Sequence, residues 1–156
     1  MTDTITTRPA TEADVVDIAD RLSPPDLNTL QTLFPASPLD ALKTMLSRGD
    51  CEAVYINGRP EALFGCTSYP SRPNRGFPWF AASRDAYSSE ARVADLVRLS
   101  QRFIDRWQGK YAELLTMNDA RNASYADWLA LLGFKVLCDL PTNSGHVFNL
   151  YFKGAL

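Results

Sequence analysis

The side chains that most often carry nucleophilic or metal chemistry are scarce in this chain. It contains one histidine, His146, and three cysteines, Cys51, Cys66 and Cys138. A single histidine excludes a multi-histidine metal site, and the cysteine spacing matches neither a structural zinc site nor a disulfide framework. Cys138 and His146 are close enough in sequence to suggest a Cys–His nucleophile pair, but such a pair needs a geometry that proximity along the chain does not supply. We expect reduced cysteines packed as small apolar side chains.

The composition is that of one ordinary globular domain. The 156 residues are 46% hydrophobic and 22% charged, and 16 basic against 18 acidic residues leave a net charge of −2. A chain of this charge lacks the basic surface of a nucleic-acid-binding protein. No run approaches the ~18 apolar residues of a membrane span, and the first residues lack the apolar segment of a secretory signal. We therefore expect a cytoplasmic protein with neither a nucleic-acid nor a membrane partner.

Apolar periodicity and capping residues predict the helices that would position functional side chains. Residues 11–22 begin with a capping-box-like pair and carry a single apolar stripe, and Pro24 and Pro25 are expected to end this helix. The other predicted helices span residues 37–49, 88–110 and 122–133, and residues 26–34 could add a further helical piece.

Short β-prone runs predict the strands. Asn57-Gly58 lies between two of them and indicates a tight hairpin, because both residues tolerate a positive φ. Residues 70–76 are rich in Pro, Arg, Asn and Gly and predict an exposed loop. The predicted strands span residues 4–7, 53–56, 62–67, 77–83, 113–117, 135–140 and 147–153. The order predicts an α/β (α+β) fold, with a central mixed, mostly antiparallel sheet of about six or seven strands flanked by about four helices.

Two motifs in this order resemble the GNAT (Gcn5-related N-acetyltransferase) superfamily. Thr7–Asp14 looks like the usual first strand and helix start of that fold. Asn122, followed eleven residues later by Gly133-Phe134, resembles the signature of its fourth helix. The resemblance covers essentially the whole chain and implies a single GNAT-like domain over residues 1–156.

Within the superfamily, the chain looks closest to the small GNAT-like internal virion protein A group of short-tailed bacteriophages. The segments that carry this narrower resemblance are Ala62–Gly65, Gly76–Phe80, Asn118–Asn122 and Trp128–Phe134. It implies a phage-encoded protein that acts in the host cytoplasm or enters the virion, with host or virion proteins as partners.

The superfamily resemblance also implies an acetyl-coenzyme A (acetyl-CoA) site. The backbone of Phe80, Ala81, Ala82 and Ser83 would hydrogen-bond the pantetheine arm as an added strand would. The start of the longest helix would bind the pyrophosphate, because free N–H groups and the positive dipole end attract anions. The residues implied there are Arg84, Ser88, Ser89 and Arg92, with Asn122 as a further contact. Alternatively, Arg84 and Arg92 are solvated surface residues and Asn122 is only a helix cap.

Two departures from the family pattern bear on this reading. Residues 84–89 contain none of the glycines usual in the pyrophosphate loop. The tyrosine that often protonates the leaving thiolate is replaced by Leu129, so the resemblance leaves Tyr125, one turn earlier, as the candidate acid; Tyr125 could equally belong to the apolar stripe. Ser83 could contact the acetyl group. Candidate general bases are Glu61, Glu113 and Asp119.

Two functions are therefore expected. The first is an acetyl-CoA-dependent N-acyltransferase acting on a small amine or a protein acceptor, which would work mostly by positioning. The second is a catalytically degenerate GNAT fold that serves as a phage internal virion or assembly protein, or binds a host protein. For the second function, Tyr69, Phe77 and Trp79 would be interface anchors if they lie outside the core.

Overall fold

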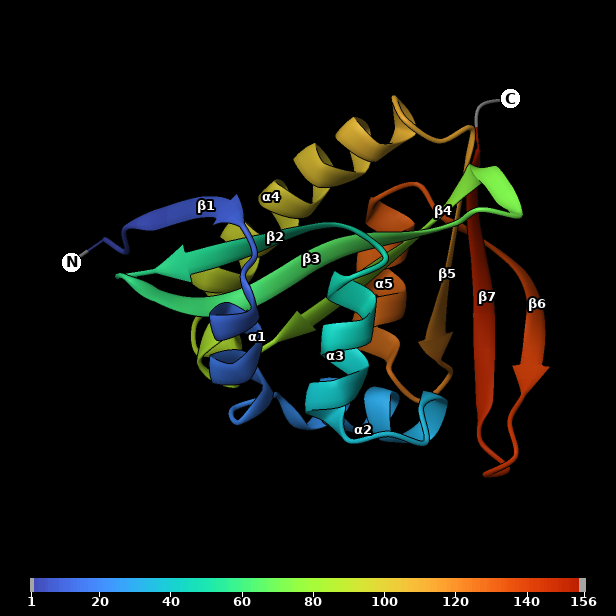
Figure 1. Cartoon of the computed structure of the whole chain (residues 1–156), viewed down its shortest axis with the longest axis horizontal. Coiled ribbons are helices and arrows are strands. Elements are labelled where there is room, and N and C mark those ends of the chain that lie inside the picture. Colours follow the sequence, from blue (N-terminus) through green and yellow to red (C-terminus); the bar gives the residue numbers. More distant parts are fainter. Residues whose placement is uncertain (1, 155–156) are drawn as a thin grey trace. The chain divides into compact units, whose positions relative to one another are not determined.

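The computed structural model describes residues 2–154 and contains a seven-stranded mixed sheet with five α-helices (Figure 1). The elements are β1 (Ile5–Pro9), α1 (Glu12–Ala19), α2 (Pro24–Leu33), α3 (Pro38–Leu46), β2 (Gly49–Ile56), β3 (Arg59–Tyr69), β4 (Arg72–Ala82), the short 3-10 helix η1 (Asp85–Tyr87), α4 (Glu90–Gln108), β5 (Glu113–Asp119), α5 (Ala123–Leu131), β6 (Lys135–Pro141) and β7 (Val147–Gly154). The strand order is β1-β2-β3-β4-β5-β7-β6. β4 and β5 run parallel, whereas β1–β2, β2–β3, β5–β7 and β6–β7 pair antiparallel. The predicted fold class is confirmed.

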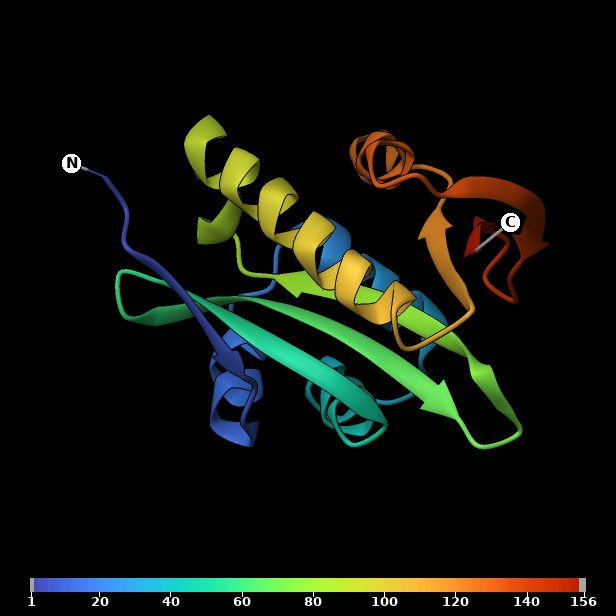
Figure 2. The same ribbon diagram turned by 90° about the horizontal axis from the view of Figure 1, so that it is seen from above.

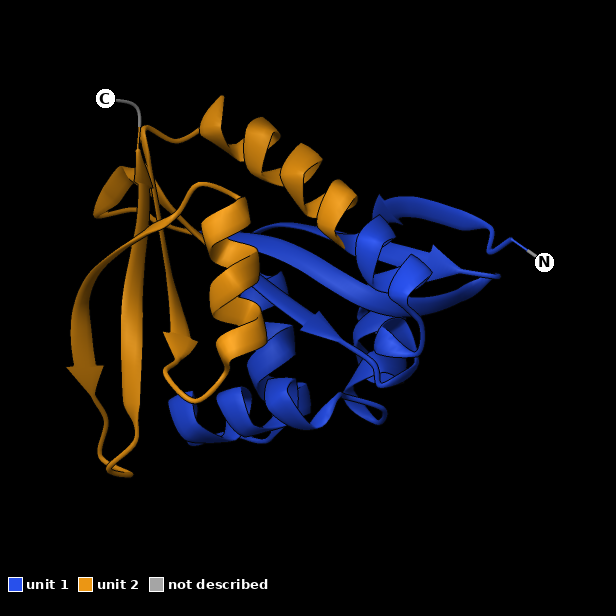
Figure 3. Ribbon diagram, turned by 180° about the vertical axis from the view of Figure 1, so that it is seen from behind, with its two compact units in different colours: residues 1–67, 79–96 blue, residues 68–78, 97–156 orange. Residues whose placement is uncertain are grey.

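The chain divides into two compact units, which are described separately (Figure 3). Unit 1 comprises residues 1–67 and 79–96, and unit 2 comprises residues 68–78 and 97–156. The boundaries cut through β3, β4 and α4, so each of these elements contributes residues to both units.

The core of unit 1 is formed by α1, α2 and α3 against its strands. In Figure 2, α1 and α3 lie on the same face of β1, β2 and β3. The buried core residues are Val15, Ile18, Leu22, Leu30, Ala41, Leu42, Cys51, Ala53, Leu63 and Ala81. Val15 and Ile18 belong to the apolar stripe predicted for the first helix, and their burial explains why α1 forms here. The helix ends at Ala19, before the predicted residue 22, and Leu22 lies in an extended bridge.

Local signals in unit 1 behave as predicted. The Thr11 hydroxyl accepts from the Asp14 amide, and the Asp14 carboxylate accepts from the Thr11 amide at 2.9 Å, which completes the capping box. Asn57 and Gly58 have φ values of 53° and 82°, as a two-residue hairpin turn of the primed type requires. Gly65 lies directly under the indole of Trp79, where a Cβ would come within 2.2 Å of the ring. Trp79 therefore packs against the core and is not an exposed anchor.

Two predictions from proline-rich segments hold only in part. The exposed loop predicted for residues 70–76 is reduced to a turn at Pro70 and Ser71, because β3 extends to Tyr69 and β4 already begins at Arg72. Pairing with neighbouring strands overrides the local turn propensity, since Arg75 and Gly76 are in register with β5. Pro24 and Pro25 do more than follow α1, because they form the first turn of α2, where a missing N–H costs nothing.

Unit 2 contains the strands β5, β7 and β6 side by side, together with α5 (Figure 1). Asn122 caps α5 by accepting from the Tyr125 amide at 3.1 Å. Gly133 ends the helix with φ 89°, and Phe134 donates to the Leu129 carbonyl at 3.0 Å. The predicted Asn–Gly-Phe signature is therefore the cap and the terminator of one helix.

Tyr69 and Phe77 also belong to unit 2, where their rings pack edge to face with centroids 5.2 Å apart. Tyr69 is 38% exposed and Phe77 is half-buried. Of the three aromatic residues considered as anchors, these two thus reach the surface as one small cluster. Across residues 2–154, no helix is long and apolar enough to cross a membrane.

Candidate active site

The end of β4 is fastened to β3 in unit 1. The Ser83 amide donates to the Glu61 carbonyl at 2.9 Å. The Ser83 hydroxyl donates to the Glu61 carboxylate at 2.7 Å and accepts from the Ala86 amide at 3.2 Å. Ser83 is fully buried. The hydroxyl predicted to contact an acetyl group therefore already holds η1 and β3 in place.

The opposite edge of β4, turned away from β3 and called here the outer edge, carries the polar groups of Ala82 and Arg84, because bonding direction alternates along a strand. It pairs with the α1–α2 linker (residues 20–23). The Ser23 amide donates to the Ala82 carbonyl at 2.9 Å, and the Arg84 amide donates to the Arg21 carbonyl at 3.0 Å. Leu22 and Ser83 face each other in this short antiparallel bridge. The linker thus pairs with the end of β4 through a single antiparallel β-bridge, in the position of an additional strand.

Asp26, near the start of α2, completes this contact. Its Oδ2 accepts from the Ala82 amide at 3.1 Å, the Ser23 hydroxyl at 2.7 Å and the Tyr87 hydroxyl at 3.3 Å. Among residues 2–154, Oδ1 has no hydrogen-bond partner. Burial raises the pKa of Asp26 to about 6, although the three donors lower it. Asp26 is thus a buried carboxyl group that can gain or lose a proton near neutral pH.

Sequence reasoning missed Asp26 as a site residue. The sequence predicts only a further helical piece over residues 26–34, with Asp26 as a candidate cap. In the structure, Ser23 makes no side-chain cap, and its amide and hydroxyl turn to Ala82 and Asp26 instead. Ser23 and Asp26 are visible as polar residues in the sequence, but Ala82, whose amide donates to Asp26, lies 56 residues away along the chain.

All three predicted general bases are paired with arginines. Glu61, which is 3% exposed, accepts from Arg21 at 2.8 Å. In unit 2, Glu113 accepts from Arg75 at 2.9 Å and Asp119 from Arg121 at 2.9 Å. The Arg121 guanidinium lowers the pKa of Asp119. An ion pair stabilises the deprotonated carboxylate, so Asp119, with its lowered pKa, is a poor proton acceptor at neutral pH.

The predicted pyrophosphate-binding residues lie in unit 1, from Arg84 just before η1 to Arg92 in the first turn of α4. Ser89 caps α4 by accepting from the Arg92 amide at 3.2 Å. The Arg92 guanidinium donates to Asp3 at 2.9 Å and to the Asp85 carbonyl at 2.9 Å. The hydrogen bond from the Arg92 guanidinium lowers the pKa of Asp3. Arg92 is therefore engaged within the protein, whereas Arg84, Ser88 and Ser89 are exposed.

In unit 2, pairing between β4 and β5 stops early. The register covers Arg75 with Glu113 and Gly76 with Leu114. The next outer-edge position is Pro78, which has no N–H to donate; its carbonyl accepts from the Thr116 hydroxyl at 2.9 Å. The last register pair precedes Pro78, because a proline ends the ladder.

The remaining predicted residues, Asn122 and Tyr125, belong to unit 2. Asn122 serves as the cap of α5, and its carbonyl accepts from the Asn118 amide group at 3.0 Å. Tyr125 is half-buried, with its ring 6.1 Å from that of Trp128. Leu129, which stands at the family's tyrosine position, is 3% exposed. A proton donor at position 129 is therefore absent, and Tyr125 stays a prediction.

The cysteines and the histidine do not assemble into a site in the described part of the chain. Cys51 and Cys66 are buried, as expected, and burial raises the pKa of the Cys51 thiol to about 12. Cys138 is exposed on β6, so the expectation of a packed side chain is wrong there. His146 lies 3.4 Å from Arg121 and makes no hydrogen bond with Cys138 within residues 2–154. No group of three His, Cys, Asp or Glu side chains in this range could hold a metal ion.

Solved structures share this fold over nearly the full chain. A proposed acetyltransferase from Acinetobacter baylyi ADP1 matches with a TM-score of 0.76 and 12% identity, covering 99% of this chain and 95% of that one. A spermidine N-acetyltransferase from Vibrio cholerae, in complex with CoA and spermine, matches with 0.72 and 11%, covering 96% and 95%. An acetyltransferase of the GNAT family from Streptococcus pneumoniae matches with 0.67 and 14%, covering 97% and 100%.

No family model and no curated protein matches the sequence. At these identities, the structural likeness establishes the fold. The chain therefore has the fold of the GNAT acetyltransferases.

Proposed function

We propose that the chain is an acetyl-CoA-dependent N-acyltransferase with a small amine or a protein amine as acceptor, acting in the cytoplasm from a single GNAT-like domain over residues 1–156. The observation that supports it is the fold, which matches acetyltransferases over 96–99% of this chain, one of them in complex with CoA. The acyl donor is a substrate here, and the chain's task is to bind and position it.

The start of α4 suits the donor's pyrophosphate. α4 has 19 residues, and the first amides of a helix have no acceptor within it. The exposed Arg84 and the hydroxyl groups of Ser88 and Ser89 could add donors there. Asp85 in η1 and Glu90 in the first turn of α4 bring negative charge to this segment and oppose an anion. We therefore expect binding that is weaker than a glycine-rich loop would allow.

The end of β4 suits the pantetheine arm poorly as it stands. The amides of Ala82 and Ser83 donate to Asp26 and Glu61. Of the predicted backbone contacts, Phe80 shares the outer edge with Ala82, whereas Ala81 shares the β3 edge with Ser83. On the outer edge, a pantetheine arm could hydrogen-bond the backbone of Phe80, whereas the carbonyl of Ala82 is already bonded to the linker.

In the proposed reaction, the neutral amine nitrogen attacks the thioester carbonyl carbon, the carbon–sulfur bond breaks, and the thiolate gains a proton as the amide nitrogen loses one. We propose Tyr125 as the donor of the thiolate's proton. Because the hydrogen of the Ser83 hydroxyl is already given to Glu61, we propose Ser83 as a positioning residue for the end of β4.

Calorimetric titration and thermal unfolding with acetyl-CoA test the proposal. A ligand at 100 times its dissociation constant should add about 2.7 kcal/mol of stability. Arg84→Ala should weaken binding, whereas Arg72→Ala, an exposed arginine in unit 2, should leave it unchanged. Release of free CoA with a polyamine or a peptide bearing a free α-amine would then identify the acceptor class. Absence of any shift at millimolar acetyl-CoA would refute the proposal.

A second candidate is the GNAT fold without transfer activity, working as a protein-binding module of phage origin. The linker on the outer edge of β4 and the leucine at position 129 favour it. The resemblance to phage internal virion proteins stays a prediction under this reading. Its partners would be host or virion proteins, and Tyr69 with Phe77 would be the first residues to test in binding.

A further inference from the structure

We infer that the α1–α2 linker is a strap that competes with the donor's pantetheine arm for the outer edge of β4, so that donor binding requires the linker to leave Ala82 and Arg84. This inference rests on the proposed function, because it supposes that an arm binds this edge. It goes beyond that function in assigning the chain an internal competitor for its own substrate.

The hydrogen-bonding evidence is that the linker, together with the Asp26 side chain at the start of α2, occupies the backbone groups that an added strand would use. Both the carbonyl and the amide of Ala82 are bonded, to the Ser23 amide at 2.9 Å and to Asp26 at 3.1 Å. The Arg84 amide is bonded to the Arg21 carbonyl at 3.0 Å. A backbone amide has one hydrogen to donate. The arm and the linker therefore cannot both be bonded to Ala82 in the same way at once.

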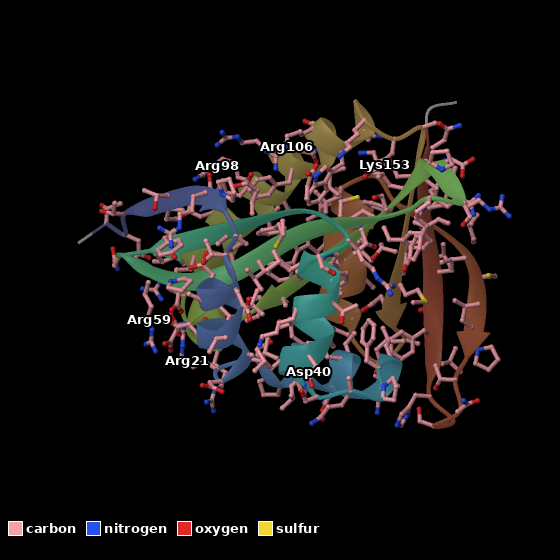
Figure 4. All side chains as sticks on the ribbon, in the orientation of Figure 1. Arg21, Asp40, Arg59, Arg98, Arg106 and Lys153 are labelled. Carbon is pink, nitrogen blue, oxygen red and sulfur yellow. The ribbon has the colours of Figure 1, made fainter. Side chains whose placement is uncertain are left out.

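Side chains hold the strap at both ends. At one end, the Arg21 guanidinium, on the side of unit 1 that also carries Arg59 in Figure 4, donates to Glu61 at 2.8 Å and to the Pro60 carbonyl at 2.6 Å. At the other end, Asp26 gathers three donors on its Oδ2. The strap is thus anchored to β3 through Arg21 and to β4 through Asp26.

The Asp26 end is the weaker anchor. Asp26 is 8% exposed, and all of its donors share one carboxylate oxygen. Taking the carboxylate out of water costs free energy, which opposes the hydrogen bonds it makes. We therefore expect the strap to open from Asp26 and release the backbone of Ala82 and Arg84, while the Arg21 guanidinium keeps it tethered to β3.

A reversible cross-link tests the competition directly. Leu22 and Ser83 are directly opposed in the antiparallel bridge, and such positions lie within the Cα separation of about 4.4–6.8 Å that a disulfide spans. The variant Leu22→Cys/Ser83→Cys should bind acetyl-CoA when reduced, and at least about ten-fold more weakly when oxidised. The reduced form of the same variant controls for the lost side chains, and wild type treated alike controls for the native cysteines. Equal affinity for acetyl-CoA in the two redox states would overturn the inference that the linker competes with the pantetheine arm.

A measurement without acetyl-CoA separates the strap from the proposed function. In Asp26→Ala, amide exchange followed by NMR should rise at Ala82 and Arg84, about ten-fold or more, while Ser83, bonded to β3, stays protected. Unchanged exchange at Ala82 and Arg84 overturns the strap whatever the binding result. If neither wild type nor the reduced double-cysteine variant binds acetyl-CoA, the proposed function fails, and the exchange rates alone decide whether the linker is released as inferred.

Discussion

Replacing Asp26 by asparagine should change how the stability of the protein depends on pH. The carboxyl has a pKa of about 6 in the folded chain, against 3.8 for the unperturbed group, and burial is the largest cause. Between these two values the folded state keeps a proton that the unfolded state has released. The free energy of unfolding therefore falls as pH rises from about 4 to about 6.

The size of this effect follows from the same two values. At about 1.4 kcal/mol for each pH unit between them, ionised Asp26 lowers the stability by about 3 kcal/mol relative to its protonated form. Asparagine keeps an oxygen that can accept from Ser23, Ala82 and Tyr87, and it does not ionise. The stability of wild type minus that of Asp26→Asn should therefore decline by about 3 kcal/mol across this range and be flat above it.

Urea unfolding followed by tryptophan fluorescence, repeated from pH 3.5 to 7.5, measures this difference. Subtracting the two curves removes the contributions of carboxylates with a lowered pKa, such as Asp14 and Asp119, which act in the opposite direction. Asp127→Asn, at an exposed position on α5, is the matched control and should give a flat difference. A flat difference for Asp26→Asn as well would refute the reasoning, because it would mean that the carboxyl is not desolvated in the folded state.

Three further substitutions test the packing around the site by urea unfolding at neutral pH. Gly65→Ala should lower stability by about 1–3 kcal/mol, because its Cβ would meet the Trp79 ring at 2.2 Å; an unchanged midpoint would show that the indole can move aside. Arg21→Met should cost at most about 3–5 kcal/mol, because buried Glu61 would keep only Arg59, at 3.9 Å, as a counter-charge, and adding Glu61→Gln should recover part of the loss. A double variant no more stable than Arg21→Met would contradict that cause. Thr11→Ala should cost about 1 kcal/mol through loss of the cap, whereas Thr11→Ser should cost little; equal losses would rule out the hydroxyl as the reason.

The parts of the fold that the sequence predicted depend on interactions within a few residues. Thr11 and Asn122 cap helices through bonds to backbone amides three residues on, and Asn57-Gly58 closes a hairpin by its own φ values. Residues 72–76 were wrongly expected to continue the loop that begins at Pro70, because their strand conformation comes from pairing with β3 and β5, which local composition does not encode.

The candidate site was harder to predict, because its bonds join distant segments. Asp26 and Ala82 are 56 residues apart, and Ser83 and Glu61 are 22 residues apart. The sequence showed which residues could donate or accept. It did not show that Ala82 would already be bonded to Asp26, or that Glu61 would be neutralised by Arg21. Periodicity assigns residues to elements, but it cannot say which partner a polar group takes in the folded chain.

Pro78 determines where β4 and β5 part because it has no backbone amide hydrogen. Every other amino acid at this position would present an amide hydrogen to the outer edge of β4, next to the carbonyl that now accepts from Thr116. Any substitution would thus offer β5 a donor at the point where the ladder now ends. At position 78 the size or polarity of the new side chain therefore does not matter for this effect, since alanine, serine and leucine would all add the same backbone amide hydrogen.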